Sequence, residues 1–471
     1  MADSLVASSG SAANSAGHSN AARRSVWVLA GAAMTVLLLT PAIWNGFPIV
    51  FPDTGGYLTV AITGMPLPGR SALYGLFLIA GIPLAFWPCV ILQCALMAWL
   101  FAVTMRVNGL GGRPWLTLCI VAGLTVTTSL PWLAGQLMPD ILFAASVLAL
   151  YLLGFAHERL ARLERYALAA VIALSIPTHM AAAGLCVALL AAFALIATAA
   201  RVRPLLCPAP RLRFAALAVA AGIALCPVSN LAVTGNFAFT PGGPGFLFGR
   251  LIEDGIVERY LGEHCPDPTI RLCPYMDDMP DQSDDWLWGN DSILYKLGGW
   301  DAHRAEQERI IRQTLLMYPG MHLEAAIVAT AMQLVTFDTE VSLDDNDPTF
   351  DAVSHFIPAL LPALNAARQH NERINVAALN YLHRPVGGLA MAALILALIL
   401  ALIPRRRLRL TPEAAALCVT ILLALAANAA ICGVFSHPVD RYQSRLVLLA
   451  PFAVAIMLAQ RARLKHTTPA T

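Results

Sequence analysis

The chain has 471 residues, of which 58% are hydrophobic and only 13% are charged, and its mean hydropathy is +0.65. Soluble domains carry about 25% charged residues. This composition therefore excludes a water-soluble enzyme, a disordered chain, a coiled coil and a disulfide-rich secreted scaffold, and it predicts an all-α polytopic membrane protein. The formal net charge of +2 gives no reason to expect a nucleic-acid partner.

Ten apolar runs follow a Ser-, Ala- and Asn-rich segment, 1–25, which we expect to be a disordered cytoplasmic tail. Most of the runs are long enough to cross about 30 Å of hydrocarbon. They cover residues 26–43, 86–105, 115–132, 139–156, 166–178, 180–200, 214–232, 386–403, 413–432 and 446–460. Pro177, Thr178 and His179 interrupt the long stretch 166–200 and predict a hairpin there.

Two further apolar segments, 71–85 and 321–337, are expected to lie along the outer interface or to fold into the outer domain. If either crossed once, the flanking basic loops would fall on opposite sides of the membrane. With ten spans, the predicted inner segments hold 18 of the 31 basic and only four of the 29 acidic residues. Because short inner loops collect Lys and Arg, both termini are predicted to be cytoplasmic, in a bacterial-type inner membrane.

This topology divides the chain into five parts. They are the tail 1–25, a seven-span bundle 26–233 with its first outer loop at 44–85, an extracytoplasmic domain 234–385 of mixed structure, a three-span bundle 386–460 and a cytoplasmic tail 461–471. In the extracytoplasmic part, apolar residues recur at helical spacing over Asp301–Tyr318 and predict a helix. Its acidic clusters, at Met276–Trp288 and Asp344–Asp351, lack the spacing of a calcium loop, so we expect a solvated acidic surface.

Two of the ten cysteines, Cys265 and Cys273, lie in this outer segment in the sequence CPDPTIRLC. An oxidising compartment permits a local disulfide between them. The sequence contains no cysteine and histidine cluster with zinc spacing, no phosphate-binding loop and no dinucleotide-binding glycine motif. It therefore gives no support to ATP-driven pumping or to dinucleotide chemistry.

Several polar residues are predicted to meet at the outer membrane face, where burial of ionisable groups is costly and often functional. They are Asp53, Tyr57, Arg70, Asp140, His179, Arg441, Tyr442 and Arg445. Simpler roles are open for most of them. Asp53 and His179 fit turns, Asp140 fits a helix N-terminus, and Arg441 and Arg445 fit interfacial anchors.

The pattern resembles the GT-C superfamily of polytopic glycosyltransferases, which includes protein mannosyltransferases and lipid A aminoarabinose transferases. Asp53 with Tyr57 looks like the acidic first-loop motif, and Met138-Pro139-Asp140 is similar to the acidic start of the fourth span. The run Arg70–Gln93 resembles the segment leading to the second span. Asp440-Arg441-Tyr442 before a Pro-containing helix looks like the late Arg-Tyr motif. The first loop has one acid where some members have two, and the outer domain has no matching pattern.

The resemblance implies a transferase that moves a sugar from a polyprenyl-phosphate donor to a glycan, lipid or protein acceptor at the outer face. Asp53 and Asp140 would be the catalytic carboxylates, with Asp53 acting as a general base or positioning the acceptor hydroxyl. Arg70, Arg441 and Arg445 would hold the leaving phosphate. Tyr57, His179 and Tyr442 would complete the substrate site. A divalent metal ion is compatible with these residues but is not required by them.

The alternative is a membrane transporter or flippase for a lipid-linked glycan or a solute, and a scaffold protein with an inactive site is a third reading. Transporters place ionisable residues near the bilayer midplane, whereas here the centres of the spans are almost free of charge. Trp286, Trp288 and Trp300 are candidate sugar-stacking surfaces, with a place in the domain core or in the interfacial aromatic belt as the simpler interpretation.

Overall fold

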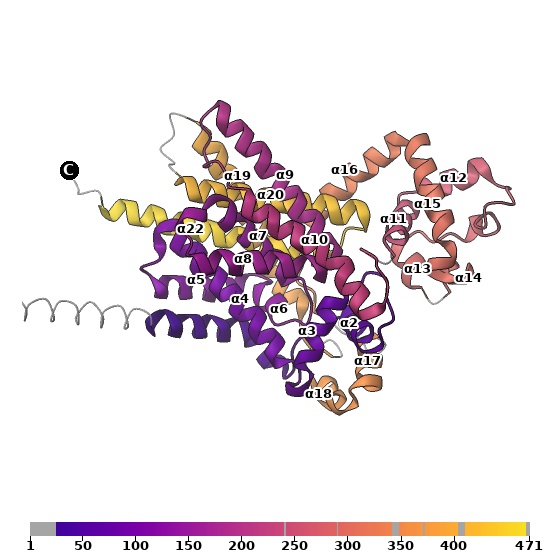
Figure 1. The fold of residues 1–471 in the computed structure, drawn as a ribbon, viewed down its shortest axis with the longest axis horizontal. Coiled ribbons are helices and arrows are strands. Elements are labelled where there is room, and N and C mark those ends of the chain that lie inside the picture. Colours follow the sequence, from indigo (N-terminus) through magenta and orange to yellow (C-terminus); the bar gives the residue numbers. More distant parts are fainter. Residues whose placement is uncertain are drawn as a thin grey trace, which may run out of the picture.

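The computed structural model describes residues 25–239, 242–289, 291–341, 348–370, 373–403 and 410–467. Within them the protein is all helical, and the only extended pairing is a single bridge between Ile49 and Gln136. Figure 1 shows a bundle of roughly parallel and antiparallel helices with a smaller lobe beside it. The first 24 residues, most of the basic loop 404–413 and the end of the C-terminal tail lie outside the described residues.

Seven helices of the described chain are long and apolar enough to cross a membrane. They are Ser25–Asn45, Trp87–Leu110 (α4, Trp87–Met105, with its last turn), α9 (Met180–Val202), α10 (Arg213–Thr234), α19 (Val376–Leu402), α20 (Pro412–Phe435) and Asp440–Arg463 (α21, Asp440–Val447, and most of α22, Leu449–Thr467). These helices agree with seven of the ten predicted spans and identify a multi-pass membrane protein.

The other three predicted spans are shorter helices. They are α5 (Pro114–Thr127), α7 (Ile141–Phe155) and α8 (Arg162–Ser175), with 14, 15 and 14 residues. At 1.5 Å per residue they measure about 21–23 Å, less than the thickness of a hydrocarbon core. Every residue of α7 except Leu142 is buried. The apolar residues on all sides of α7 are therefore explained by its place at the centre of the bundle. The presence of ten membrane spans stays a prediction.

Contacts at the two ends of the bundle show which helix ends lie together. At the end next to the lobe, hereafter the lobe end, Thr54 donates to the carbonyl of Leu137 and Ser71 to that of Pro177. At the opposite end, side-chain contacts join Arg106 to Glu164, Arg159 to Glu413 and Gln460 to Asn108. The expected break in the stretch 166–200 is present, because α8 ends at Ser175 and α9 begins at Met180.

The two ambiguous apolar segments both pack at the lobe end. The first forms α3 (Ala72–Gly81), which contacts α2 (Pro52–Thr63), α4 and α10. The second forms α16 (Pro319–Val335), which bends by 101° from α15 (Gly299–Met317) and packs along α20. Ala329 of α16 packs closely on Gly433 of α20, because a Cβ added to Gly433 would lie 2.7 Å from the carbonyl oxygen of Ala329. This segment therefore joins the bundle rather than the lobe.

The lobe comprises the described residues of 243–318 and has a separate hydrophobic core that includes Phe248, Trp286 and Ile310. Its helices are α11 (Gly243–Glu253), α12 (Ile256–His264), α13 (Ser283–Trp288), α14 (Ile293–Lys296) and α15. Helix α15 covers almost all of the predicted helix Asp301–Tyr318. A domain of mixed structure was expected here, and the described residues of the lobe contain helices and turns without a strand.

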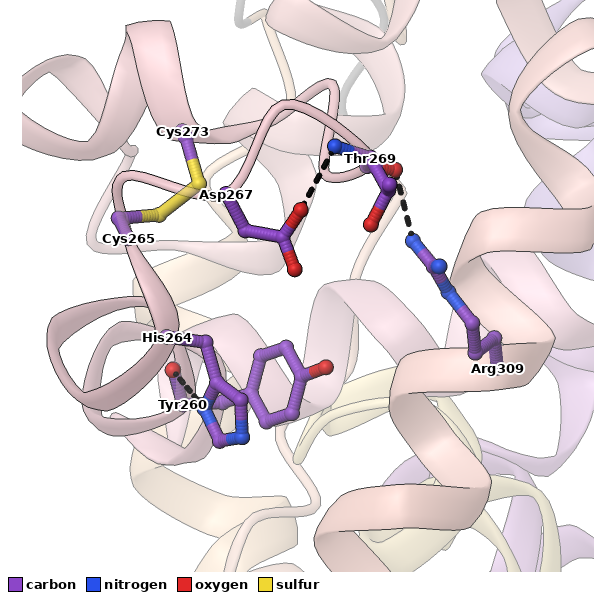
Figure 2. Close-up of a disulfide and its surroundings, with 7 residues drawn as sticks. All are labelled: Tyr260, His264, Cys265, Asp267, Thr269, Cys273 and Arg309. Carbon is purple, nitrogen blue, oxygen red and sulfur yellow. Dashed lines mark hydrogen bonds between the residues drawn. A yellow bond between two sulfur atoms is a disulfide. The ribbon is translucent and has the colours of Figure 1, made fainter.

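The expected disulfide between Cys265 and Cys273 closes the loop after α12, with the two Cα atoms 5.5 Å apart. Figure 2 shows the loop beside it, in which Asp267 accepts from the backbone N–H of Thr269 and Arg309 of α15 donates to the Thr269 carbonyl. The disulfide thus fixes a loop that α15 also holds.

The remainder of the predicted outer domain leaves the lobe and returns to the bundle. Helices α17 (Pro348–Phe356) and α18 (Leu361–Ala366) follow the lobe in sequence, and α17 packs against α2. Gln369 then donates to the carbonyl of Val50 and accepts from Asn45 and Val50, so it fixes the chain just before α2. The segment 234–385 is therefore divided between the lobe and the bundle.

Candidate functional site

Asp53 lies in the first turn of helix α2 and not in an isolated turn. Pro52 begins the helix, where its fixed φ angle and missing N–H are tolerated. Thr54 closes the turn by accepting from the backbone N–H of Phe51. A carboxylate in the first turn also interacts favourably with the helix dipole. The local sequence therefore sets Asp53 at the positive end of a short helix.

The two glycines of α2 each allow a different neighbour to pack closely against the helix. A Cβ on Gly55 would lie 2.5 Å from the carbonyl oxygen of Pro348, whereas a Cβ on Gly56 would lie 3.0 Å from the side chain of Arg70. The Thr349 hydroxyl accepts from the Gly55 N–H and donates to the Phe51 carbonyl. Gly55 thus allows α17 to dock on α2 and hold the Asp53 turn.

Two arginines bind the Asp53 carboxylate, one on each oxygen. Arg70 pairs with Oδ1, and Nη1 of Arg441 lies 2.8 Å from Oδ2. The side chains of all three are at most 18% exposed. The Arg441 guanidinium also lies 4.5 Å from the ring centroid of Phe51, in cation–π geometry. We call Asp53, Arg70 and Arg441 the arginine clamp.

The arginine clamp keeps Asp53 ionised. Burial by itself raises the pKa of Asp53, but the positive charges of Arg70 and Arg441 outweigh burial and hold that pKa below its ordinary value. Both carboxylate oxygens are already engaged, so Asp53 is poorly placed to take up a proton or to ligate a metal ion.

A second, fully buried pair joins Asp140 to Arg445, with Oδ1 and Nη1 3.2 Å apart and both side chains 0% exposed. Arg445 also donates to Asn428 and stacks over Phe143, with 3.4 Å between guanidinium and ring centroid. Neither Asp140 nor Arg445 lines the cavity described below. The pair therefore lies behind the site and joins the start of α7 to α21.

His179 caps the N-terminus of α9, where its Nδ1 accepts from the backbone N–H of Ala181. Burial lowers the pKa of His179, and the positive charges of Arg445 and Arg441 lower it further. The ring is therefore neutral, and the cap leaves Nε2 as the nitrogen that carries a proton. His179 can present one neutral hydrogen-bond donor.

A cavity of about 560 Å³ opens between the lobe end of the bundle and the lobe. Five of the predicted site residues line it, namely Asp53, Arg70, His179, Arg441 and Tyr442. Aromatic side chains form much of the remaining wall, namely Phe51, Phe239, Phe246, Trp288 and Phe435. The site thus combines a charged floor with apolar walls, a composition suited to a ligand with both polar and apolar parts.

The other predicted site residues have supporting positions. Tyr57 is 1% exposed and packs edge-on against Tyr74, whose hydroxyl donates to Gln93. Of the three tryptophans, Trp286 is in the lobe core, whereas Trp288 lines the cavity with Arg70 over its ring. Trp300 packs against Phe246 and Trp288 and supports that wall.

Sequence reasoning missed three ionisable residues that line the cavity, Glu340, Asp284 and His437. His437 contacts Ser283 and Asp284 of α13 at 3.2 and 3.4 Å and so connects the last loop of the bundle to the lobe. Glu340 follows α16. One acid among 22 in the segment 234–384 has no local pattern that distinguishes it, and only the tertiary fold brings it to the site.

A second cavity of about 610 Å³, the groove, continues from the first between α9, α20 and the lobe. The two share Met180, Phe246 and Phe435. The groove is mostly apolar, with Glu308 and Arg312 as its only charged residues among those described. A ligand that reaches from cavity to groove passes from polar to apolar surroundings.

No three His, Cys, Asp or Glu side chains of the described chain are close enough together to hold a metal ion. Asp344 and Asp345 of the second acidic cluster lie outside the described residues. The expectation that the acidic segment has no calcium site therefore stays a prediction.

The fold and the cavity define a helical, multi-pass membrane protein with an amphiphilic site at one end of the bundle. No family model, no curated protein and no solved structure matches the chain.

Proposed function

We propose that the protein is a membrane glycosyltransferase of the GT-C type. It moves a sugar from a polyprenyl-phosphate donor to an acceptor at the outer face of a bacterial-type inner membrane. The observation that carries the proposal is the continuity of the arginine clamp, the aromatic cavity and the apolar groove. A ligand with a phosphate head and a hydrocarbon chain needs a charged site that continues into an apolar one.

The charges of the arginine clamp suit a phosphate. The two arginines and one carboxylate give the clamp a net charge of +1. Arg70 and Arg441 each donate only one hydrogen bond to Asp53. Their remaining donors can form paired hydrogen bonds to phosphate oxygens. Asp53 then orients the two guanidinium groups, and the neutral His179 donates to the sugar or to the phosphate.

A lipid donor is supported by exposed apolar residues on α15 and α16, of which Leu315 lines the groove. Leu315, Leu316, Leu323 and Ile327 of α15 and α16 are all more than half exposed. Apolar side chains on this scale face lipid more readily than water. A donor in the bilayer can then slide its chain along the groove while its head enters the cavity.

The topology belongs to the same proposal. We infer ten spans, with α5, α7 and α8 as three short crossings, both termini in the cytoplasm and the lobe outside. The support is the concentration of 18 of the 31 basic residues in the predicted inner segments. Ion pairs at the end opposite the lobe, including Arg106 with Glu164, agree with an arginine-rich inner face.

The test uses purified protein in proteoliposomes with a panel of polyprenyl-phosphate hexoses and pentoses, and it measures sugar transfer and release of polyprenyl phosphate. We expect activity with one donor, and a fall of about 10²-fold or more in Arg441→Gln, because a positioned charge on the phosphate is lost. Arg304→Gln, on the exposed face of α15, is the matched control. Movement of the lipid-linked sugar across the bilayer without transfer would instead identify a flippase.

A further inference from the structure

The cavity contains three acids whose surroundings differ. Asp53 is held by two guanidinium groups, and Asp284 pairs with His437 on the lobe side. Within the part of the chain that the structure describes, no ion pair or side-chain hydrogen bond engages the carboxylate of Glu340. Glu340 is therefore the cavity carboxylate with free acceptor oxygens.

The backbone on the N-terminal side of Glu340 is firmly anchored. The Asp338 N–H donates to the Asp440 carboxylate at 2.6 Å, and the Thr339 N–H donates to Asn380 at 2.7 Å. The Thr339 hydroxyl also contacts His383 Nδ1 at 2.8 Å. Helices α19 and α21 therefore fix the segment that presents Glu340 to the cavity, which the residues of the arginine clamp also line.

The surroundings of Glu340 favour proton uptake, chiefly through desolvation. Exclusion of water by the surrounding protein raises the pKa of Glu340, although its side chain is accessible from the cavity. Arg441 lowers that pKa, whereas Asp440, Asp53 and Asp140 raise it, and the net change is upward. A carboxylate with a raised pKa is a better proton acceptor near neutral pH than one locked in ion pairs.

We propose that Glu340, rather than Asp53, accepts the proton of the acceptor hydroxyl, an inference that rests on the proposed transferase function. The hydroxyl oxygen forms a bond to the anomeric carbon of the donor, and its proton passes to Glu340. The bond from that carbon to the phosphate oxygen breaks, and its electron pair stays on the polyprenyl phosphate. Arg70 and Arg441 bind this leaving group, so Asp53 is a positioning residue.

The decisive variants are Glu340→Gln and Glu340→Asp in the full chain, with Glu258→Gln on the exposed face of α12 as the control. We expect Glu340→Gln to lower kcat for transfer by about 10²–10⁴-fold and to change the affinity for farnesyl phosphate, the binding probe, by less than about threefold. Glu340→Asp should restore part of kcat. In wild-type protein, activity should fall as Glu340 is protonated, at a pH above the ordinary pKa of glutamate.

The outcomes separate the two proposals. If the wild-type protein transfers sugar and Glu340→Gln transfers it equally well, the inference is wrong and the transferase proposal stands. If the wild-type protein binds farnesyl phosphate but transfers no sugar from the donor panel, the transferase proposal fails and the inference fails with it.

A second measurement does not depend on turnover. Dicyclohexylcarbodiimide reacts with protonated carboxyl groups in apolar surroundings, and peptide mass spectrometry locates the adduct. We expect labelling of Glu340, protection by farnesyl phosphate and little labelling of Asp53, whose oxygens are engaged. Labelling of Asp53 with Glu340 unmodified would overturn the inference.

Discussion

At the scale of single residues, Asp53 has two roles, of which the sequence indicates only one. Its position in a short loop beside a membrane span indicates a functional carboxylate. The arginine clamp adds a structural role, because Arg441 has a side chain only 10% exposed. Removing one partner of a buried pair leaves the other charge uncompensated.

We therefore predict that Asp53→Asn loses both activity and stability. The loss of orientation of Arg70 and Arg441 should reduce transfer by about 10²-fold, and the uncompensated arginines should lower the free energy of unfolding by about 3 kcal/mol. Sugar transfer and thermal unfolding in detergent measure the two effects. A variant with wild-type activity would refute the clamp as the phosphate site, and Asp53→Glu should restore part of both properties.

The stability due to Asp53 should depend on pH in a definite direction. Its pKa is lower in the folded protein than the ordinary value of 3.8, so the clamp stabilises the fold above that value and loses this effect as Asp53 is protonated. The difference in melting temperature between the wild-type protein and Asp53→Asn should therefore be constant above about pH 5 and narrow as the pH falls below 3.8. A difference that does not narrow would show that the charge of Asp53 is irrelevant to stability.

At the scale of helices, the contact of α2 with α17 sets the geometry of the clamp. We predict that Gly55→Ala lowers transfer and costs about 1–3 kcal/mol of stability, because the new Cβ would lie 2.5 Å from the Pro348 carbonyl oxygen. Gly123→Ala in α5 is the matched control, since no atom lies within 4 Å of a Cβ there. Equal behaviour of the two variants in activity and thermal unfolding would contradict this role of Gly55.

In the lobe, the disulfide between Cys265 and Cys273 stabilises the loop after α12. Replacing Cys265 and Cys273 by serine should lower lobe stability by about 2 kcal/mol, because the loop that the bond closes is short. Limited proteolysis should then cut the lobe before the bundle, whereas Cys119→Ser should leave the pattern unchanged. Mass spectrometry of non-reduced peptides tests the pairing directly, and two free thiols in exported protein would exclude it.

The sequence predicts the helices well where hydropathy determines them. It predicts them poorly where tertiary packing determines them. Seven long helices and the break before His179 agree with the apolar runs. Helix α7 shows the difficulty. Its apolar sequence predicts a membrane span, but the apolar side chains are buried against other helices of the bundle. The sequence indicates a turn at Asp53 but not the helix α2 that the turn begins, and the need for Gly55 in that helix arises from Pro348, almost 300 residues away.

For the site, the sequence identifies the residues that adjoin spans and misses those that long-range folding brings in. Asp53, Arg70, His179 and Arg441 each lie beside the end of a span or interfacial helix, where a charge is conspicuous. Glu340 lies in a segment rich in acids, so no local signal separates it from its neighbours. Its place in the cavity follows from long-range packing, namely that of α16 on α20 and the contacts of Asp338 and Thr339 with α21 and α19.

At the scale of the whole molecule, the prediction concerns sidedness. Ser354→Cys on α17 and Ala161→Cys before α8 are both exposed, at the lobe end and the opposite end. In a background without Cys119, the one exposed free thiol, a membrane-impermeant maleimide added outside should label the first variant and not the second. Labelling of Ala161→Cys alone would reverse the topology and place the cavity in the cytoplasm.

The arginine clamp also has a consequence for how the protein is made. Arg441 follows Asp53 by 388 positions, so the ribosome has inserted nearly all of the helices before the second guanidinium reaches the carboxylate. Thr349, which fixes α2, is also synthesised late. An unfinished chain that stops before α21 therefore lacks the complete clamp and the part of the cavity wall that Arg441 and Tyr442 form. The timing of synthesis thus delays completion of the site until the last helices are in place.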